Sequence, residues 1–194
     1  MTTEPDCYDQ YVKALGLLCA GWARLDRELN ALLGAVLQCS DAQIACIATE
    51  MNDVAPRCRL LKTLVYTVDV PKLWREDVAD LCNIISNEIG PSRNRYIHDN
   101  FGFVDEALHK IDRRAKLLKP ASFTDLTLDF DRAEAVDNEA VERTAVQAIS
   151  ASARLATARF DLEHQQREGH FPARPQLERA RIMEIRQFRS PQAE

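Results

Sequence analysis

Apolar residues in the first part of the chain recur at intervals of three and four, which is the period of a helix with one buried face. This stripe predicts a long first helix over residues 9–38. A second stripe over residues 44–68 follows Ser40 to Gln43, a capping-box sequence that begins a helix. Because the connection is so short, we expect the second helix to lie antiparallel to the first. The first stripe comprises Leu15, Leu18, Trp22, Leu25, Leu29, Leu32 and Val36.

A third helix is predicted from Trp74 onwards, and Gly90-Pro91 interrupts it. Proline lacks a backbone N–H, and its ring clashes with the carbonyl four residues earlier, so we expect a kink or a fresh helical start there. The six residues from Arg93 to His98 then lie on a short helical segment of their own. We expect that segment to stop near Gly102.

Two regions complete the fold prediction. Partial alternation of apolar and polar residues between Val104 and Arg132 predicts a β-hairpin or an extended flap. A last long helix is predicted over 138–168, and the stretch after it forms a short exposed basic helix or stays disordered. The chain is therefore expected to be mainly α, a four-to-five-helix up-and-down bundle with a small β-hairpin or extended insert between the third and last bundle helices. In domain terms this is a bundle over residues 1–168 with an insert at 103–133, and a tail over 169–194.

Composition narrows the class of protein. With 46% hydrophobic and 28% charged residues, the chain is typical of a soluble globular protein. It has no apolar run long enough to span a membrane and begins without the pattern of a secretion signal, so we expect a cytoplasmic protein that does not contact membrane. A net charge of −5 argues against a protein whose whole surface binds nucleic acid. Any contact with a polyanion must be local.

The six cysteines do not have the spacing of a zinc site, and most of them occupy apolar helical positions. Buried free thiols are the favoured interpretation. The four histidines are also spread without metal-ligand spacing. We therefore expect no metal site and no cofactor.

The candidate chemistry lies in Arg93-Asn94-Arg95-Tyr96-Ile97-His98. An imidazole exchanges protons near neutral pH, and a guanidinium neutralises charge that gathers on phosphate oxygens. Together they suit cleavage of a phosphodiester without a metal. In RNA the adjacent 2′-hydroxyl is the natural nucleophile, so the expected products carry a 2′,3′-cyclic phosphate and a 5′-hydroxyl.

Four helices with Arg93-Asn94, three further residues and His98 on the third resemble the HEPN superfamily, over roughly residues 9–168. Many members of that family are metal-independent endoribonucleases, often toxins or defence effectors, that work as homodimers with two motifs facing one cleft. The resemblance implies that Arg93 and His98 are catalytic and that Asn94 orients His98 or the phosphate. RNA, and a protein antitoxin or regulator, are then the candidate partners.

Helix geometry also favours a dimer. Residues five apart project about 140° apart around a helix, so Arg93 and His98 of one chain do not both point at one small target. A locally widened helix or a curled arginine side chain would solve this within one chain. A two-fold axis, which brings the same segment of two chains together, would instead complete the site in a dimer. Basic residues outnumber acidic ones between positions 93 and 119, and this side of the insert supplies candidate RNA-backbone contacts. Arg95 of the motif is a further candidate contact to phosphate. The candidate RNA-backbone contacts on the insert are Lys110, Arg113, Arg114 and Lys116.

A structural interpretation stands beside the catalytic one. Arg95 and Asp99 are four apart and suit a surface ion pair, while His98 suits the carbonyls at a helix end. The alternative function is thus a catalytically inactive helical dimer that serves as a regulatory or protein-interaction module. A second Arg-x4-His sequence, from Arg159 to His164, contains acids that would pair with its arginine.

Overall fold

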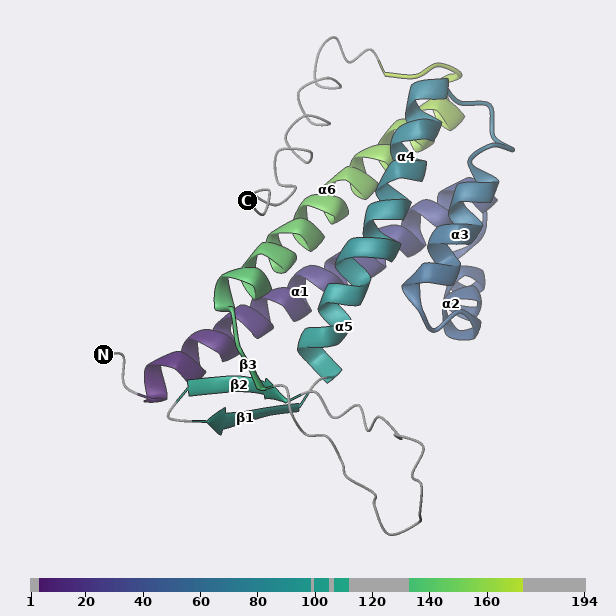
Figure 1. Cartoon of the computed structure of the whole chain (residues 1–194). Coiled ribbons are helices and arrows are strands. Elements are labelled where there is room, and N and C mark those ends of the chain that lie inside the picture. The colour runs from purple at the N-terminus through teal and green to yellow at the C-terminus, as the bar shows by residue number, and fades with distance from the viewer. Residues whose placement is uncertain (1–3, 99, 105–106, 112–132, 173–194) are drawn as a thin grey trace, which may run out of the picture.

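The computed structural model describes residues 4–98, 100–104, 107–111 and 133–172 (Figure 1). These residues are mainly helical, which confirms the expected class. Three short strands lie between the helix that carries residues 93–98 and the last helix. The helices are α1 (Glu4–Leu37), α2 (Asp41–Glu50), α3 (Val54–Leu64), α4 (Lys72–Ile84), the π-helical turn η1 (Ile85–Ile89), α5 (Gly90–His98) and α6 (Asn138–Glu168).

The two longest helices, α1 and α6, lie side by side and run in the same direction (Figure 1). Near the start of the pair, a Cβ added to Gly21 would come within 3.1 Å of the carbonyl oxygen of Ala145. Near its end, Gln166 donates a hydrogen bond to the carbonyl of Ala35 at 3.1 Å. The limits of α6 are those predicted, whereas α1 begins at Glu4, before its predicted start at residue 9, and ends at Leu37, close to its predicted end. The α6 stripe is buried as predicted and comprises Val141, Thr144, Ala148, Ala151, Leu155, Ala158 and Leu162.

The prediction of one second helix antiparallel to the first is wrong. Residues 51–53 separate α2 from α3, and α2 turns from α1 by 118°. The physical reason is Pro56, which lies in the first turn of α3, where backbone N–H groups have no helical partner. In a continuous helix its ring would meet the carbonyl of Asn52. The predicted capping box is confirmed, with Gln43 Oε1 accepting from the backbone N–H of Ser40 at 2.9 Å.

The third predicted helix continues through Gly90-Pro91 by way of the π turn η1. The backbone N–H of Gly90 donates to the carbonyl of Ile85, five residues earlier. The wider turn allows α4 and α5 to follow one another although Pro91 has no N–H to donate. A Cβ on Gly90 would lie 3.1 Å from that carbonyl, so the turn also favours glycine here. The segment ends at His98, before the expected stop near Gly102.

The strands β1 (Asn100–Val104), β2 (Ala107–Ile111) and β3 (Ala133–Ala135) form an antiparallel sheet in that order. Residues 112–132, most of the predicted insert, lie outside the described residues, as does the tail from residue 173. The form of the insert and the division into domain and tail therefore stay predictions.

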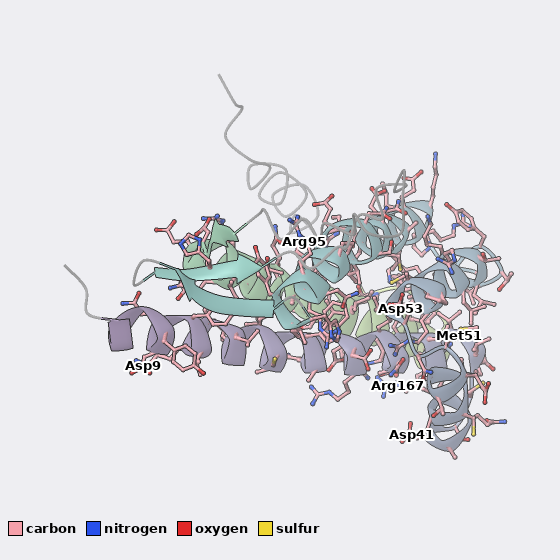
Figure 2. The ribbon with its side chains drawn as sticks, turned by 60° about the horizontal axis from the view of Figure 1, so that its bottom comes forward. Asp9, Asp41, Met51, Asp53, Arg95 and Arg167 are labelled. Atoms are coloured by element: carbon pink, nitrogen blue, oxygen red, sulfur yellow. The ribbon has the colours of Figure 1, made fainter. Side chains whose placement is uncertain are left out.

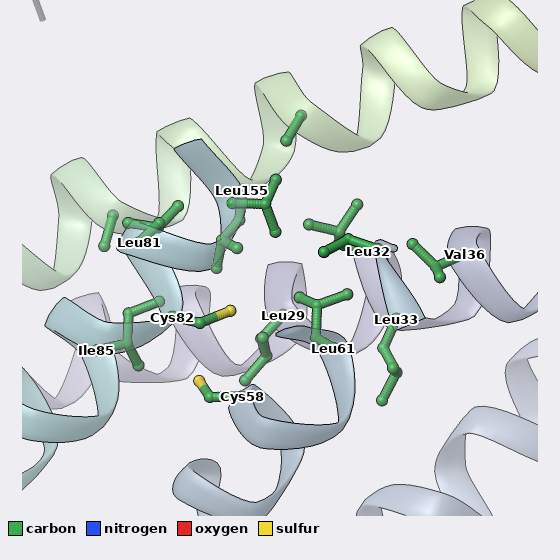
Figure 3. Close-up of a cluster of buried hydrophobic side chains, with 14 of the residues drawn as sticks. Leu29, Leu32, Leu33, Val36, Cys58, Leu61, Leu81, Cys82, Ile85 and Leu155 are labelled. Atoms are coloured by element: carbon green, nitrogen blue, oxygen red, sulfur yellow. The ribbon is translucent and has the colours of Figure 1, made fainter. Parts of the chain in front are cut away.

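The main core lies where α1, α3, α4 and α6 meet (Figure 3). Cys58 and Cys82 are buried within it as free thiols, whereas Cys19 and Cys46 are exposed. The expectation of buried free thiols therefore holds for two cysteines and fails for two on the surface. Fully buried side chains around the two thiols include Leu29, Leu61, Leu81, Ile85 and Leu155.

Among the described residues, no single helix has the length and apolar content needed to cross a membrane. Residues 8–37 and 41–50 meet those criteria only when the bent pair is taken together.

Candidate functional site

The predicted motif, Arg93 to His98, occupies all of α5 after its first turn, and this helix contacts α1, α6 and η1. Asn94, Arg95 and His98 are exposed, and Arg93 is half-buried. Figure 2 shows Arg95 on α5. The motif is therefore an accessible surface feature whose first arginine is held against the rest of the protein.

Arg93 is held by Trp22 of α1. The guanidinium carbon of Arg93 lies 5.2 Å from the centre of the Trp22 ring, within the range of a cation–π contact. One Nη atom of Arg93 donates to Oδ1 of Asn94 at 2.9 Å. The Nε atom is buried and has no hydrogen-bond acceptor among the described residues. Asn94 thus contacts the arginine of the motif.

His98 is the last residue of α5 and is exposed. With Arg95 it places basic side chains in the last turn, where the helix dipole favours positive charge. Within the described part of the chain, Arg93 contacts Trp22 and Asn94, and no contact joins it to His98. One chain therefore presents the two predicted catalytic residues without pairing them.

The backbone of Tyr96 connects the motif to α1. The hydroxyl of Tyr11 on α1 donates a hydrogen bond to the carbonyl oxygen of Tyr96 at 3.0 Å. Burial and then the negative charge of Asp137 raise the pKa of Tyr96, while Arg95 and Arg143 oppose that rise. The phenol is therefore neutral at physiological pH, and the Tyr96 side chain packs against a buried cluster that includes Tyr11 and Val141.

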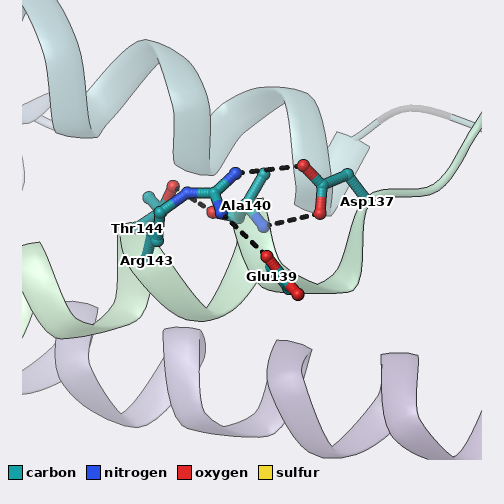
Figure 4. A network of polar contacts seen from close by, with 5 residues as sticks. All are labelled: Asp137, Glu139, Ala140, Arg143 and Thr144. Atoms are coloured by element: carbon teal, nitrogen blue, oxygen red, sulfur yellow. Dashed lines mark hydrogen bonds and ion pairs between the residues drawn. The ribbon is translucent and has the colours of Figure 1, made fainter. Parts of the chain in front are cut away.

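Charged side chains form a network of polar contacts at the start of α6 (Figure 4). Arg143 donates to Asp137 at 3.0 Å and to Glu139 at 3.3 Å. Asp137 also caps α6, since it accepts from the backbone N–H of Ala140. This network stabilises the first turns of α6, and its charges at Asp137 and Arg143 also act on Tyr96 of α5.

Sequence reasoning assigned no role at the site to Trp22 or Tyr11. Trp22 belongs to the apolar stripe of α1, so its pattern indicates only core packing. Tyr11 lies before the first residue of that stripe. To assign either residue to the site, one must know which helix packs against α5. Helical periodicity does not give this information.

The predicted RNA-backbone contacts on the insert lie outside the described residues. Arg113, Arg114 and Lys116 fall within the segment 112–132, and of Lys110 only the backbone is described, as part of β2. Their role stays a prediction.

The second Arg-x4-His sequence is part of an ion-pair network, as its acidic neighbours predicted. Arg159 contacts Glu163 at 2.8 Å and Glu28 at 3.5 Å, and the hydrogen bond to Glu163 contributes most to raising its pKa. His164 packs on Phe160, with ring centres 6.4 Å apart. This pair therefore differs from Arg93 and His98 in that its arginine is neutralised by carboxylates.

A cleft of about 590 Å³ opens between the end of α1, the start of α2 and the end of α6. Arg159 and Glu163 line it, and no residue of the motif does. Among the described residues, no group of three or more His, Cys, Asp or Glu side chains is placed to hold a metal ion.

Comparison of the chain with protein-family models, with curated proteins and with solved structures found no significant match.

Proposed function

We propose that this protein is a HEPN-like endoribonuclease that cleaves RNA without a metal ion. The 2′-hydroxyl oxygen attacks the adjacent phosphorus, and the bond to the 5′-oxygen breaks. One imidazole accepts the 2′-hydroxyl proton, and another donates a proton to the leaving 5′-oxygen. Arg93 compensates the charge that develops on the phosphate oxygens. The products carry a 2′,3′-cyclic phosphate and a 5′-hydroxyl.

One observation carries this proposal: the Arg93 guanidinium is held by an aromatic ring and an amide, without a carboxylate among the described residues. An arginine whose charge is not neutralised within the protein remains available to a phosphate. His98, five residues further on, is exposed and so accessible to a substrate. Asn94 orients the Arg93 guanidinium by accepting a hydrogen bond from it.

The proposal includes a homodimer. Because Arg93 and His98 project about 140° apart on α5, one helix does not direct both at one phosphate. In a two-fold pair the motif helices of two chains lie close together, so the second chain supplies the residue that the first does not direct at the phosphate. The proposed architecture is an up-and-down bundle whose basic insert adds contacts to the RNA backbone.

The test is cleavage of a pool of structured and single-stranded RNA in EDTA by the wild type and by His98→Ala and Arg93→Ala. His164→Ala and Arg59→Ala are the matched controls, since they remove the same side chains from α6 and from the exposed face of α3. We expect the two motif variants to lose cleavage at unchanged helicity and oligomeric state while the controls retain it. Intact RNA with the wild type, or equal cleavage by all five proteins, would refute the proposal.

A catalytically inactive interaction module is the second candidate. It is favoured by the fact that the contacts of Arg93 with Trp22 and Asn94 join parts of its own chain, as a packing residue would. The two candidates differ in RNA binding. Phosphate contacts release counterions, so the ribonuclease binds RNA more weakly as salt rises, whereas the module binds none at low salt.

A further inference from the structure

Five other arginines of the described chain are each paired with at least one carboxylate, and one of them, Arg27, contacts Glu28 at 3.1 Å. Arg57 contacts Asp26 at 2.6 Å, and Arg154 contacts Asp77. The remaining two lie on α6, each with two acidic partners. They are Arg143, with Asp137 and Glu139, and Arg159, with Glu28 and Glu163.

Arg93 is held in a different way. Its guanidinium lies over the face of Trp22, and its buried Nε–H has no hydrogen-bond acceptor among the described residues. An aromatic face carries partial negative charge, so it stabilises a cation and tolerates an N–H directed at it. Such a contact fixes the side chain and leaves its formal charge uncompensated.

Trp22 is itself fixed by close packing. It is half-buried and lies against the main core. A Cβ added to Gly90 would lie 3.7 Å from Cη2 of Trp22, so α5 and the indole ring approach closely at this point. The ring therefore sets the position of Arg93 relative to the bundle, three residues after Gly90.

We infer that Trp22 is a positioning residue of the proposed ribonuclease site: it holds the Arg93 guanidinium in place for a phosphate without neutralising it. This inference rests on the proposed function. Trp22 acts through Arg93 and does not contact the reacting atoms. A carboxylate in its place would also fix Arg93 but would compete with the phosphate for its charge.

The first test compares Trp22→Phe, which keeps an aromatic face, with Trp22→Leu, which removes it. Trp74→Phe is the control for the loss of a tryptophan from the core. We expect Trp22→Leu to lower the cleavage rate about three- to thirty-fold, the range that corresponds to a cation–π contact, and Trp22→Phe to lower it less. Full activity of Trp22→Leu beside an inactive Arg93→Ala would overturn the inference and leave the ribonuclease intact.

The second test does not need cleavage. The Nε–H resonance of Arg93, assigned with Arg93→Lys, should lie at the unusual shift that an indole ring current produces, and Trp22→Leu should move it towards the ordinary arginine position. Titration with a deoxyribonucleotide oligomer, which lacks the 2′-hydroxyl, should shift the resonance in the wild type at lower concentrations than in Trp22→Leu. Equal titration of both proteins would overturn the positioning role. If the wild type binds the oligomer through Arg93 but no RNA is cleaved, the positioning role stands and only the catalytic proposal fails.

Discussion

The hydroxyl of Tyr11 donates a hydrogen bond to the backbone carbonyl oxygen of Tyr96 at 3.0 Å, across 85 positions of the chain. The acceptor lies in the last turn of α5, where carbonyl groups have no partner within the helix. This bond attaches the predicted motif to α1, and the contact between Arg93 and Trp22 attaches it a second time. Two contacts with α1, the longest described helix, therefore fix the position of α5.

We expect Tyr11→Phe to destabilise the protein by about 1 kcal/mol, because the ring stays buried while the hydrogen bond is lost. Urea unfolding followed by circular dichroism measures this change. Tyr66→Phe, a change at an exposed tyrosine whose ring contact with Arg75 is retained, is the control and should alter stability much less. An equal effect of the two substitutions would show that the hydroxyl of Tyr11 contributes nothing particular.

Two glycines of α1 should respond differently to replacement by alanine. A Cβ on Gly16 would meet nothing within 4 Å, whereas one on Gly21 would lie 3.1 Å from both the backbone oxygen of Ala145 and a side-chain carbon of Ile149. Gly16→Ala should stabilise the protein by about 0.5–1 kcal/mol through helix propensity. Gly21→Ala should lose that gain, because α1 and α6 must move apart. Stabilisation of the same size by both changes in thermal unfolding would contradict the close packing of the two helices.

The pair of Arg57 and Asp26 predicts an unequal response to the loss of either partner. The Arg57 side chain is 5% exposed, and that of Asp26 is 36% exposed. Asp26→Ala leaves a buried guanidinium with Asn30 as its remaining side-chain partner in the described chain and should cost about 3 kcal/mol. Arg57→Met removes the buried charge and leaves a carboxylate that water can reach, so it should cost less. Chemical denaturation of both variants tests the order, and the reverse order would contradict it.

Stability should fall at alkaline pH. A hydrogen bond with Cys58, together with burial, raises the pKa of Cys82 above its ordinary range. A raised folded-state pKa means that the contribution of the neutral thiol is complete below the unfolded pKa of about 8.5 and is lost as pH rises beyond it. The free energy of unfolding should therefore decrease by up to about 1.4 kcal/mol for each pH unit above that value.

Urea unfolding in the presence of a reductant, at a series of pH values from about 7 to about 10, checks this dependence. Cys82→Ala should show a shallower decrease than the wild type. Cys46→Ala removes an exposed thiol and should leave the decrease unchanged. If the pH dependence is the same in all three proteins, groups other than Cys82 cause it. Tyr96, whose pKa is also raised, is one of them.

Periodicity predicted much of the helical structure because burial of one face leaves a repeat in the chain. The stripe of α1 and the limits of α6 were predicted in this way, and the capping box at Ser40 marked the start of α2. The same method missed the break between α2 and α3. Apolar spacing continued across it, and the local effect of Pro56 on the backbone decided the outcome.

The candidate site divides in a similar way. The sequence by itself determined that Arg93, Asn94 and His98 lie on one short helix after Gly90-Pro91, since residue type, spacing and proline chemistry are local properties. Only the tertiary structure decided that Trp22 holds Arg93 and that Tyr11 holds the end of the helix. These contacts join positions that are far apart in the chain, and their geometry depends on how α1, α5 and α6 pack. Helical periodicity indicates which face of a helix is buried but not which helix covers it, because any apolar stripe of suitable length satisfies the same pattern.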